Sequence, residues 1–258
     1  MMLLPQNIAH IWLVDLRTVP DARLEDYRKL LSEDELARLE NYKNPKVQRT
    51  QLITRAAVRV CLSQYSDSIP PKSWRFERNE DGKPQLVQPA PMPLSFNLSH
   101  SGDWLAIAVT VETPLGVDVQ HKTTRPAHLE LAQRYFHPDE VEELEACPSE
   151  AARLELFFRF WTLKEAYLKA RGTGIVTGLE KIRFHIDNNG WIIATMAPEL
   201  DDDSQQWQFH HYHLGEEYSL SLAVNQPRAQ DACPCFYKVI PLALEERLHT
   251  QAHRILLH

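Results

Sequence analysis

The alternation of hydrophobic and polar residues predicts strands and helices that follow one another along the whole chain. From Trp104 to Val111 nearly every residue is apolar, as in a strand that is buried on both faces. Shorter apolar or alternating runs predict further strands at 8–16, 74–77, 94–102, 117–120, 182–186, 191–196, 207–213 and 218–224. Apolar positions at three- and four-residue steps predict helices between many of these strands.

Two helices are predicted in the first half of the chain. Ser32 and Glu35 have the spacing of a capping box, and the helix they begin ends before Asn44-Pro45. The second helix covers about 45–64. On or just before it lie basic residues outside its apolar side: Lys43, Lys46, Arg49, Arg55 and Arg59. This set is either a solvated basic surface or an anion site, because the planar guanidinium fork matches phosphate oxygens.

In the second half, two short helices at 129–136 and 138–144 precede a longer one that ends at Gly172 and Gly174. The long helix has an apolar stripe formed by Leu156, Phe160, Leu163, Tyr167 and Ala170. The other side carries Trp161, Glu165 and Lys169, one turn apart, with Lys164 beside them. Glu165 and Lys169 could hold a metal and a phosphate, or form a surface ion pair worth roughly 0.2–0.5 kcal/mol.

The predicted strand near residue 118 carries an acidic residue between valines. Val117 and Val119 point to one face of the strand, and Asp118 and Gln120 to the other. Burying a carboxylate is costly without a partner, so a metal or another cation is one interpretation. A solvated sheet face, or a role in capping a turn, is the alternative.

The order of the predicted elements indicates an α+β fold with two similar α/β halves, each a small, mainly antiparallel sheet packed on a long helix. Each half has a strand, a helix and then a run that ends in an apolar strand. We therefore expect an N-terminal half at 1–112, a C-terminal half at 113–225 and a C-terminal extension at 226–258, with a helical stretch at 242–257.

Composition narrows the possible partners. The 258 residues carry a net charge of −7, which argues against general binding to nucleic acid or to anionic membranes. No run approaches the roughly 18 apolar residues that span a bilayer, and Met1–Pro5 lacks the features of a secretory signal. The scattered cysteines match no zinc pattern, so we expect a cytoplasmic protein in a reducing compartment. His211 and His213 share a strand face and could bind a metal, but no third ligand follows at a set spacing.

Several of these segments together resemble the 4′-phosphopantetheinyl transferases of the single-chain, Sfp-like type. The resemblance covers about residues 10–225, and the segments that carry it are Gly82-Lys83-Pro84, Phe96-Asn97-Leu98-Ser99-His100-Ser101, Gly116-Val117-Asp118, Arg134-Tyr135-Phe136 and Trp161-Thr162-Leu163-Lys164-Glu165-Ala166-Tyr167-Leu168-Lys169. Such enzymes transfer the 4′-phosphopantetheine arm of coenzyme A to a serine of an apo acyl or peptidyl carrier protein. They release adenosine 3′,5′-bisphosphate, and coenzyme A lies between the two halves.

The resemblance also implies roles for individual residues. Asp118 and Glu165 match carboxylates that hold Mg²⁺ on the pyrophosphate, a chemistry in which positioning and charge stabilisation dominate. Glu165 also matches the base for the carrier serine, and Lys169 the lysine that neutralises or protonates the leaving phosphate. The expected contacts to coenzyme A are Lys83, Ser99, His100, Arg49 and Thr50, with Arg55 and Lys43 in the same basic area. Glu140 matches an acidic position near the metal, and Phe136, Ile175 and 171–177 are candidate contacts to the carrier.

One position departs from the family pattern, because Gln120 stands where many members have a glutamate. Its amide oxygen can bind Mg²⁺ but adds no charge. Two other interpretations therefore remain: a family member that binds coenzyme A without transferring it, and a metal-dependent hydrolase built on His211 and His213. The resemblance implies a monomer, whereas the carrier and the pathway that it serves are left open.

Overall fold

The structure is a computed structural model that describes residues 2–6, 8–78, 84–87, 93–123, 128–172, 178–186, 191–227 and 233–242. In the first half the elements are β1 (Ile8–Asp15), α1 (Leu24–Leu30), α2 (Glu33–Glu40), α3 (Pro45–Ser63), β2 (Phe76–Arg78), β3 (Pro84–Leu86), β4 (Leu94–Ser101) and β5 (Trp104–Val111). In the second half they are β6 (Leu115–His121), α4 (His128–Tyr135), α5 (Pro138–Glu145), α6 (Glu150–Arg171), β7 (Ile182–Ile186), β8 (Ile192–Met196), β9 (Gln208–Leu214) and β10 (Tyr218–Val224). A last strand, β11 (Cys233–Lys238), follows them.

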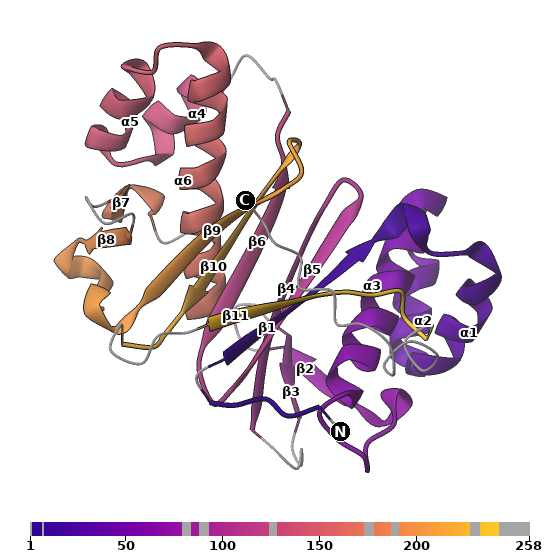
Figure 1. The fold of residues 1–258 in the computed structure, drawn as a ribbon. Coiled ribbons are helices and arrows are strands. Elements are labelled where there is room, and N and C mark those ends of the chain that lie inside the picture. Colours follow the sequence, from indigo (N-terminus) through magenta and orange to yellow (C-terminus); the bar gives the residue numbers. More distant parts are fainter. Residues whose placement is uncertain are drawn as a thin grey trace.

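The two halves repeat one topology, which confirms the predicted α+β fold. The first sheet contains the strand order β1-β5-β4 and the second the order β6-β10-β9, all antiparallel. In each half the first strand of the sheet is followed by a long helix, α3 or α6. A two-stranded hairpin, β2–β3 or β7–β8, then precedes the second strand of the sheet, β4 or β9. Figure 1 shows α1–α3 on one side of the molecule and α4–α6 on the other, with both sheets between them.

The extension adds a strand to the first sheet, which the sequence pattern did not reveal. β11 pairs in parallel with β1, so that Trp12 lies opposite Tyr237, and their rings stack with centroids 4.7 Å apart. The hydroxyl of Tyr27 on α1 donates to the carbonyl of Pro241 at 2.8 Å. The part of 226–258 that the structure describes is therefore attached to the first half, whereas the helix expected at 242–257 lies almost wholly outside the described residues.

Capping signals in the sequence correctly placed the helices that flank the site. Ser32 accepts from the backbone of Glu35, and Glu35 accepts in return from the backbone of Ser32, which confirms the capping box of α2. Asn44 caps α3, with Pro45 in its first turn. α6 ends where predicted, because Gly172 adopts the left-handed conformation with φ of 75°. α1 is a helix that was not predicted.

Side chains of β4 join the first sheet to the second. Asn97 Oδ1 accepts from the backbone nitrogen of Val117 at 2.9 Å, and Ser101 Oγ accepts from that of His121 at 3.0 Å. These bonds satisfy β6 backbone groups along the edge that β10 does not cover. They also fix β4 beside β6, so that the side chain between them on β4, Ser99, faces Asp118.

The second half is organised around α6, which is buried on nearly all sides rather than on one stripe. Lys164 is completely buried and points away from the predicted polar side. Its ammonium contacts Glu140 Oε2 at 2.7 Å and donates to the carbonyl oxygens of Leu179 and Ile182. Glu140 also accepts from the backbone of Phe184 at 2.8 Å. This satisfied ion pair ties α5, α6 and the start of β7 together.

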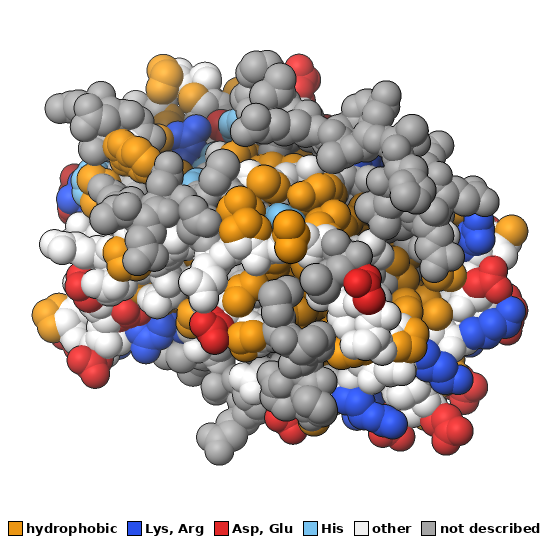
Figure 2. Space-filling model, turned by 60° about the horizontal axis from the view of Figure 1, so that its bottom comes forward, with side chains coloured by type: hydrophobic (Ala, Val, Ile, Leu, Met, Phe, Trp, Pro, Cys, Tyr) orange, Lys and Arg blue, Asp and Glu red, His pale blue; other side chains and the backbone are white. Residues whose placement is uncertain are grey.

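One face of the molecule mixes charges of both signs. Figure 2 shows basic and acidic side chains interspersed along its right-hand edge, with hydrophobic ones gathered nearer the centre. Neighbouring residues on α1 form such pairs, for example Lys29 with Asp26 at 2.9 Å. No extended basic area is seen among the side chains coloured on this face. Among the described helices, none has the length and hydrophobicity that crossing a membrane requires.

The glycine of the Gly-Val-Asp segment lets β6 touch the backbone of α6. A Cβ at Gly116 would lie 2.0 Å from the carbonyl oxygen of Ala166 and 2.5 Å from the nitrogen of Ala170. Backbone atoms of a buried helix cannot move aside cheaply, so β6 or α6 must shift. We expect Gly116→Ala to lower the free energy of unfolding by about 3 kcal/mol or more, as measured by urea denaturation.

Gly215→Ala is the matched control, because a Cβ at Gly215 meets nothing within 4 Å. Its φ of +59° makes alanine strained there, at a cost of about 1–2 kcal/mol. Equal destabilisation by the two changes would contradict the close approach of β6 and α6.

Candidate active site

A cavity of about 330 Å³ lies where β4, β6 and α6 meet. Its lining brings together most of the residues that the sequence singled out, namely Leu98, Ser99, His100, Asp118, Gln120, Trp161, Glu165 and Lys169. Residues of β4, alternate residues of β6, and residues one turn apart on α6 each line part of this cavity. Residues from both halves of the chain therefore form one site.

Asp118 is the most buried acidic group of this cavity, with 1% of its surface exposed. Lys169 Nζ approaches its Oδ1 to 2.6 Å, and Ser99 Oγ donates to the same oxygen at 2.7 Å. Lys169 also donates to Ser99 Oγ at 2.8 Å. The interpretation of Lys169 as half of a surface ion pair with Glu165 is therefore wrong, because its partner is a buried carboxylate on β6.

Glu165 lies beside this pair and is nearly buried, with 8% of its surface exposed. Its Oε1 has no hydrogen-bond partner among the described residues. Burial, and then the negative charge of Asp118, raises the pKa of Glu165 to about 7, although Lys169 acts in the opposite direction. A carboxyl group that titrates near neutral pH is suited to accept a proton at physiological pH.

These two carboxylates fit a Mg²⁺ ion. Two acidic groups face one cavity, the charge of Asp118 helps to raise the pKa of Glu165, and one buried oxygen lacks a hydrogen-bond partner among the described residues. Mg²⁺ uses one or two carboxylates together with water and phosphate oxygens. Gln120 is not oriented as a metal ligand, because its Nε2, and not its oxygen, faces Asp118 Oδ2 at 3.3 Å. Its oxygen accepts from Ser101 at 3.3 Å, so Gln120 could bind a metal only after its amide turns over.

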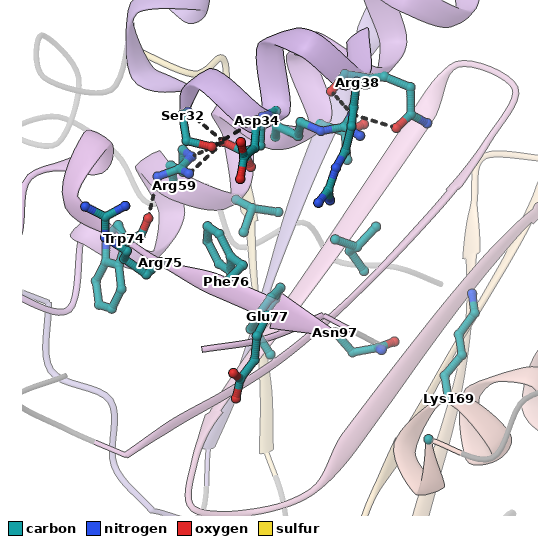
Figure 3. Close-up of a pocket in the computed structure, with 18 of the residues that line it drawn as sticks. Ser32, Asp34, Arg38, Arg59, Trp74, Arg75, Phe76, Glu77, Asn97 and Lys169 are labelled. Carbon is teal, nitrogen blue, oxygen red and sulfur yellow. Dashed lines mark hydrogen bonds and ion pairs between the residues drawn. The ribbon is translucent and has the colours of Figure 1, made fainter. Parts of the chain in front are cut away.

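A larger cavity of about 700 Å³ adjoins the first, and Leu98 and Lys169 line both. Figure 3 shows Arg38 on α2 and Lys169 on α6 at opposite sides of this cavity. Its basic lining consists of Arg38, Arg55, Arg59, Arg75 and Lys169. Arg59 is bound to Glu35 at 2.6 Å, and Arg55 to Gln51 at 2.8 Å. Three acidic residues, Asp34, Glu35 and Glu77, also line the cavity. Arg38 and Arg75 extend the set of basic residues, which we call the basic wall, and sequence reasoning missed them because single basic residues look like ordinary surface charges.

The structure brings some of the predicted coenzyme A contacts to the cavities and not others. Ser99, His100 and Arg55 line them. Arg49, Thr50 and Lys43 do not. The Arg49 guanidinium donates to the carbonyl oxygens of Leu16 and Val19, at 3.0 and 2.7 Å. Lys83 lies outside the described residues.

Loss of solvent around its ring, and then the charge of Lys169, lower the pKa of His100. Much of the residue nevertheless stays accessible at the cavity mouth. A neutral imidazole is therefore favoured there, able to donate or accept one hydrogen bond.

Two expectations about the surroundings of the site are corrected. Glu140 does not lie near the proposed metal, because its carboxylate is fully buried against Lys164 and backbone amides. Phe136 is not exposed to a carrier, because it is 3% exposed and stacks on Phe157 with ring centroids 5.3 Å apart. Ile175 lies outside the described residues.

Comparison with known proteins agrees with this geometry. Residues 114–223 match the 4′-phosphopantetheinyl transferase superfamily, and residues 20–112 match the N-terminal region of 4′-phosphopantetheinyl transferases. A protein of Synechocystis sp. described as a putative 4′-phosphopantetheinyl transferase is 38% identical over 182 residues, 70% of each chain. The 4′-phosphopantetheinyl transferase HetI of Nostoc sp. is 37% identical over 174 residues, 67% of this chain and 72% of that protein.

Among solved structures, a holo-(acyl-carrier-protein) synthase from Bacillus anthracis in complex with coenzyme A (3′,5′-ADP) is 19% identical. It covers 43% of this chain and 93% of its own, with a TM-score of 0.37. That likeness is too distant to bear on the site. The sequence matches, which cover both halves and include a relative of 38% identity, show that this chain belongs to the 4′-phosphopantetheinyl transferase family.

Proposed function

We propose that this protein transfers 4′-phosphopantetheine from coenzyme A to a serine of an apo acyl or peptidyl carrier protein. One observation carries the proposal: Lys169 lines both cavities and contacts Asp118 at 2.6 Å. A nucleotide bound along the basic wall of the larger cavity would thus present its pyrophosphate to the carboxylates of the smaller one. The family matches support the same reaction.

In this reaction the serine oxygen forms a bond to the phosphorus that carries pantetheine, and the bond from that phosphorus to the bridging pyrophosphate oxygen breaks. Adenosine 3′,5′-bisphosphate leaves. We infer that Glu165 accepts the serine proton, directly or through water, because its pKa is about 7. Lys169 neutralises the charge that develops on the departing phosphate. Mg²⁺, held by Asp118 and Glu165, would stabilise charge on the pyrophosphate.

Several features remain predictions from the sequence: the apo-carrier, Mg²⁺ dependence, a cytoplasmic location and a monomeric state. The division into an N-terminal half that binds the nucleotide and a C-terminal half that binds the metal is also a prediction. The coenzyme A contacts at Lys83, Arg49, Thr50 and Lys43 are also predictions from the sequence alone, since none of these residues lines a cavity in the described structure.

The reaction is tested by incubating the protein with coenzyme A, Mg²⁺ and several apo-carrier proteins and measuring the carrier mass. We expect a gain equal to one phosphopantetheine group. Glu165→Gln should slow the transfer about 10²- to 10⁴-fold and leave binding of coenzyme A intact. The matched control is Glu150→Gln at the start of the same helix, where the carboxylate is 72% exposed and pairs with Arg153. No mass gain with any carrier would leave a family member that only binds coenzyme A.

The raised pKa of Glu165 makes Mg²⁺ binding depend on pH. Below about pH 7 this carboxyl is protonated, so a metal must displace the proton, and above pH 7 it is already ionised. We expect the Mg²⁺ affinity to fall about tenfold for each pH unit below 7 and to level off above it. Calorimetry in buffers of different ionisation enthalpy measures the released proton.

Glu165→Gln removes the titrating group and should remove the pH dependence in this range. Mg²⁺ binding to the unaltered protein that stays constant from pH 5 to 8 would show that Glu165 is not a ligand.

The basic wall of the larger cavity predicts where the nucleotide binds. Arg38 points into this cavity from α2. A charge-assisted hydrogen bond to phosphate is worth about 1.5–3 kcal/mol, so Arg38→Gln should weaken coenzyme A binding roughly 10- to 100-fold. Arg28→Gln on α1 is the control, because Arg28 lines neither cavity and its nearest acidic partner, Glu25, is 76% exposed. Equal affinities of the two variants, measured by calorimetry without Mg²⁺, would place the nucleotide elsewhere.

A further inference from the structure

A row of polar side chains crosses the second sheet beneath α6. In the strand register, Ser221 on β10 lies between Asp118 on β6 and His211 on β9. Two residues further along these strands, Ser219 lies between Gln120 and His213 in the same way. Neighbouring strands are about 4.8 Å apart, so His211 is about 10 Å across the sheet from Asp118. The sheet therefore has a second polar site at its other edge.

Glu155 on α6 supplies the third group of this second site, which sequence spacing did not reveal. Its Oε1 lies 3.3 Å from His213 Nδ1 and 4.0 Å from His211 Nε2. All three atoms lie within 4.8 Å of one another. Ligands bound tetrahedrally at about 2.1 Å are about 3.4 Å apart. A shift of a few tenths of an ångström to about one ångström brings these atoms to that spacing.

Two of the three candidate ligand atoms are buried and make no hydrogen bond among the described residues. His211 has a side chain that is 6% exposed, and its Nε2 makes no hydrogen bond among the described residues. Glu155 Oε1 makes none either. The other ring nitrogen of His211 lies 3.0 Å from Ser221 Oγ. When Nδ1 donates to this hydroxyl, the lone pair of Nε2 faces a carboxylate oxygen, an arrangement that a cation between them stabilises.

A charged neighbour orients the carboxylate of this site. Lys122 Nζ holds the second oxygen of Glu155 at 2.7 Å, and Oε1 is directed at the two imidazoles. The positive charges of Lys122 and Arg159 also reduce the affinity for a cation. Glu155 and His213 are about one-third exposed, which gives an ion access from solvent.

We propose that Glu155, His211 and His213 bind a first-row transition-metal ion such as Zn²⁺, at a site separate from the Asp118–Glu165 carboxylates. Imidazole nitrogens with one carboxylate suit Zn²⁺, whereas Mg²⁺ prefers an all-oxygen set. Three protein ligands leave a fourth position for water. Because Glu155 lies on α6 and both histidines on β9, the bound ion cross-links helix and sheet and stabilises the folded state.

The test is a Zn²⁺ titration of the full chain by calorimetry, with excess Mg²⁺ present to compete for Asp118 and Glu165. We expect one tightly bound Zn²⁺ and a rise in melting temperature. Glu155→Gln and His213→Ala should each weaken this binding at least about tenfold. Both side chains are partly exposed, so these variants should fold. His210→Ala is the control, because successive residues of β9 point to opposite faces, and it should bind Zn²⁺ like the unaltered chain.

A Co²⁺ absorption spectrum identifies the ligand type. Nitrogen and oxygen ligation that is lost in Glu155→Gln supports the site. Thiolate ligation, Zn²⁺ affinities that are equal in all variants, or no binding at a hundredfold excess of Zn²⁺ would overturn it. Shifts of the His211 and His213 imidazole resonances on adding Zn²⁺ give a readout that does not depend on transferase activity.

Discussion

The rest of the site depends on the buried negative charge of Asp118. A carboxylate that is 1% exposed needs a cation and hydrogen-bond donors, and it obtains them from two other elements. Lys169 comes from the last turns of α6 and Ser99 from β4. Each partner can reach Asp118 only if its element lies against β6. The glycine at 116 permits the helix to do so, and hydrogen bonds from β4 to the β6 backbone hold the other side. An apolar cluster of both sheets forms the rest of the junction between the halves, and Asp118 provides its polar centre.

The same charge also acts on the neighbouring Glu165. The two carboxylates line one cavity, and Lys169 supplies one positive charge for the two. Burial is the larger cause of the raised pKa of Glu165, and the negative charge of Asp118 adds to it. The charge of the proposed Mg²⁺ would offset the remaining negative charge, and Lys169 could then pair with a phosphate of the proposed substrate. Gln120, which stands where many family members have a glutamate, lowers the negative charge of the site but leaves its two carboxylates, Asp118 and Glu165, in place.

The sequence predicted what local pattern determines. Most of the strands (β3 at Pro84–Leu86 was not predicted), the capped helices, the end of α6 at Gly172 and the placing of Asp118 and Glu165 in one site follow from periodicity, capping residues and the family resemblance. Side-chain partners that lie far apart in sequence did not follow. Lys164 looked like part of the polar side of α6 but is buried against Glu140, and Arg38, which lines the larger cavity, was not singled out. β11 was missed because its residues, which include Cys233 and Pro234, show no strand pattern of their own. The strand forms by pairing with β1, which is distant in the sequence.

The apolar stripe predicted for α6 is packed in the core as expected, but the side opposite it is not the exposed polar face that such a stripe usually implies. From Phe157 onward α6 is covered on nearly all sides, so most of its polar residues there have buried partners. Thr162 meets Ser221 at 2.8 Å, Lys164 meets Glu140, and Lys169 meets Asp118. Three buried side-chain polar atoms of α6 make no hydrogen bond among the described residues: Glu155 Oε1, Arg159 Nε and Glu165 Oε1. The two carboxylate oxygens among them face different polar groups, because Glu165 lies beside Asp118 and Glu155 Oε1 lies 3.3 Å from His213 Nδ1. These are the two places at which we propose a bound cation, since a cation can satisfy a buried carboxylate oxygen that hydrogen bonds leave unpaired.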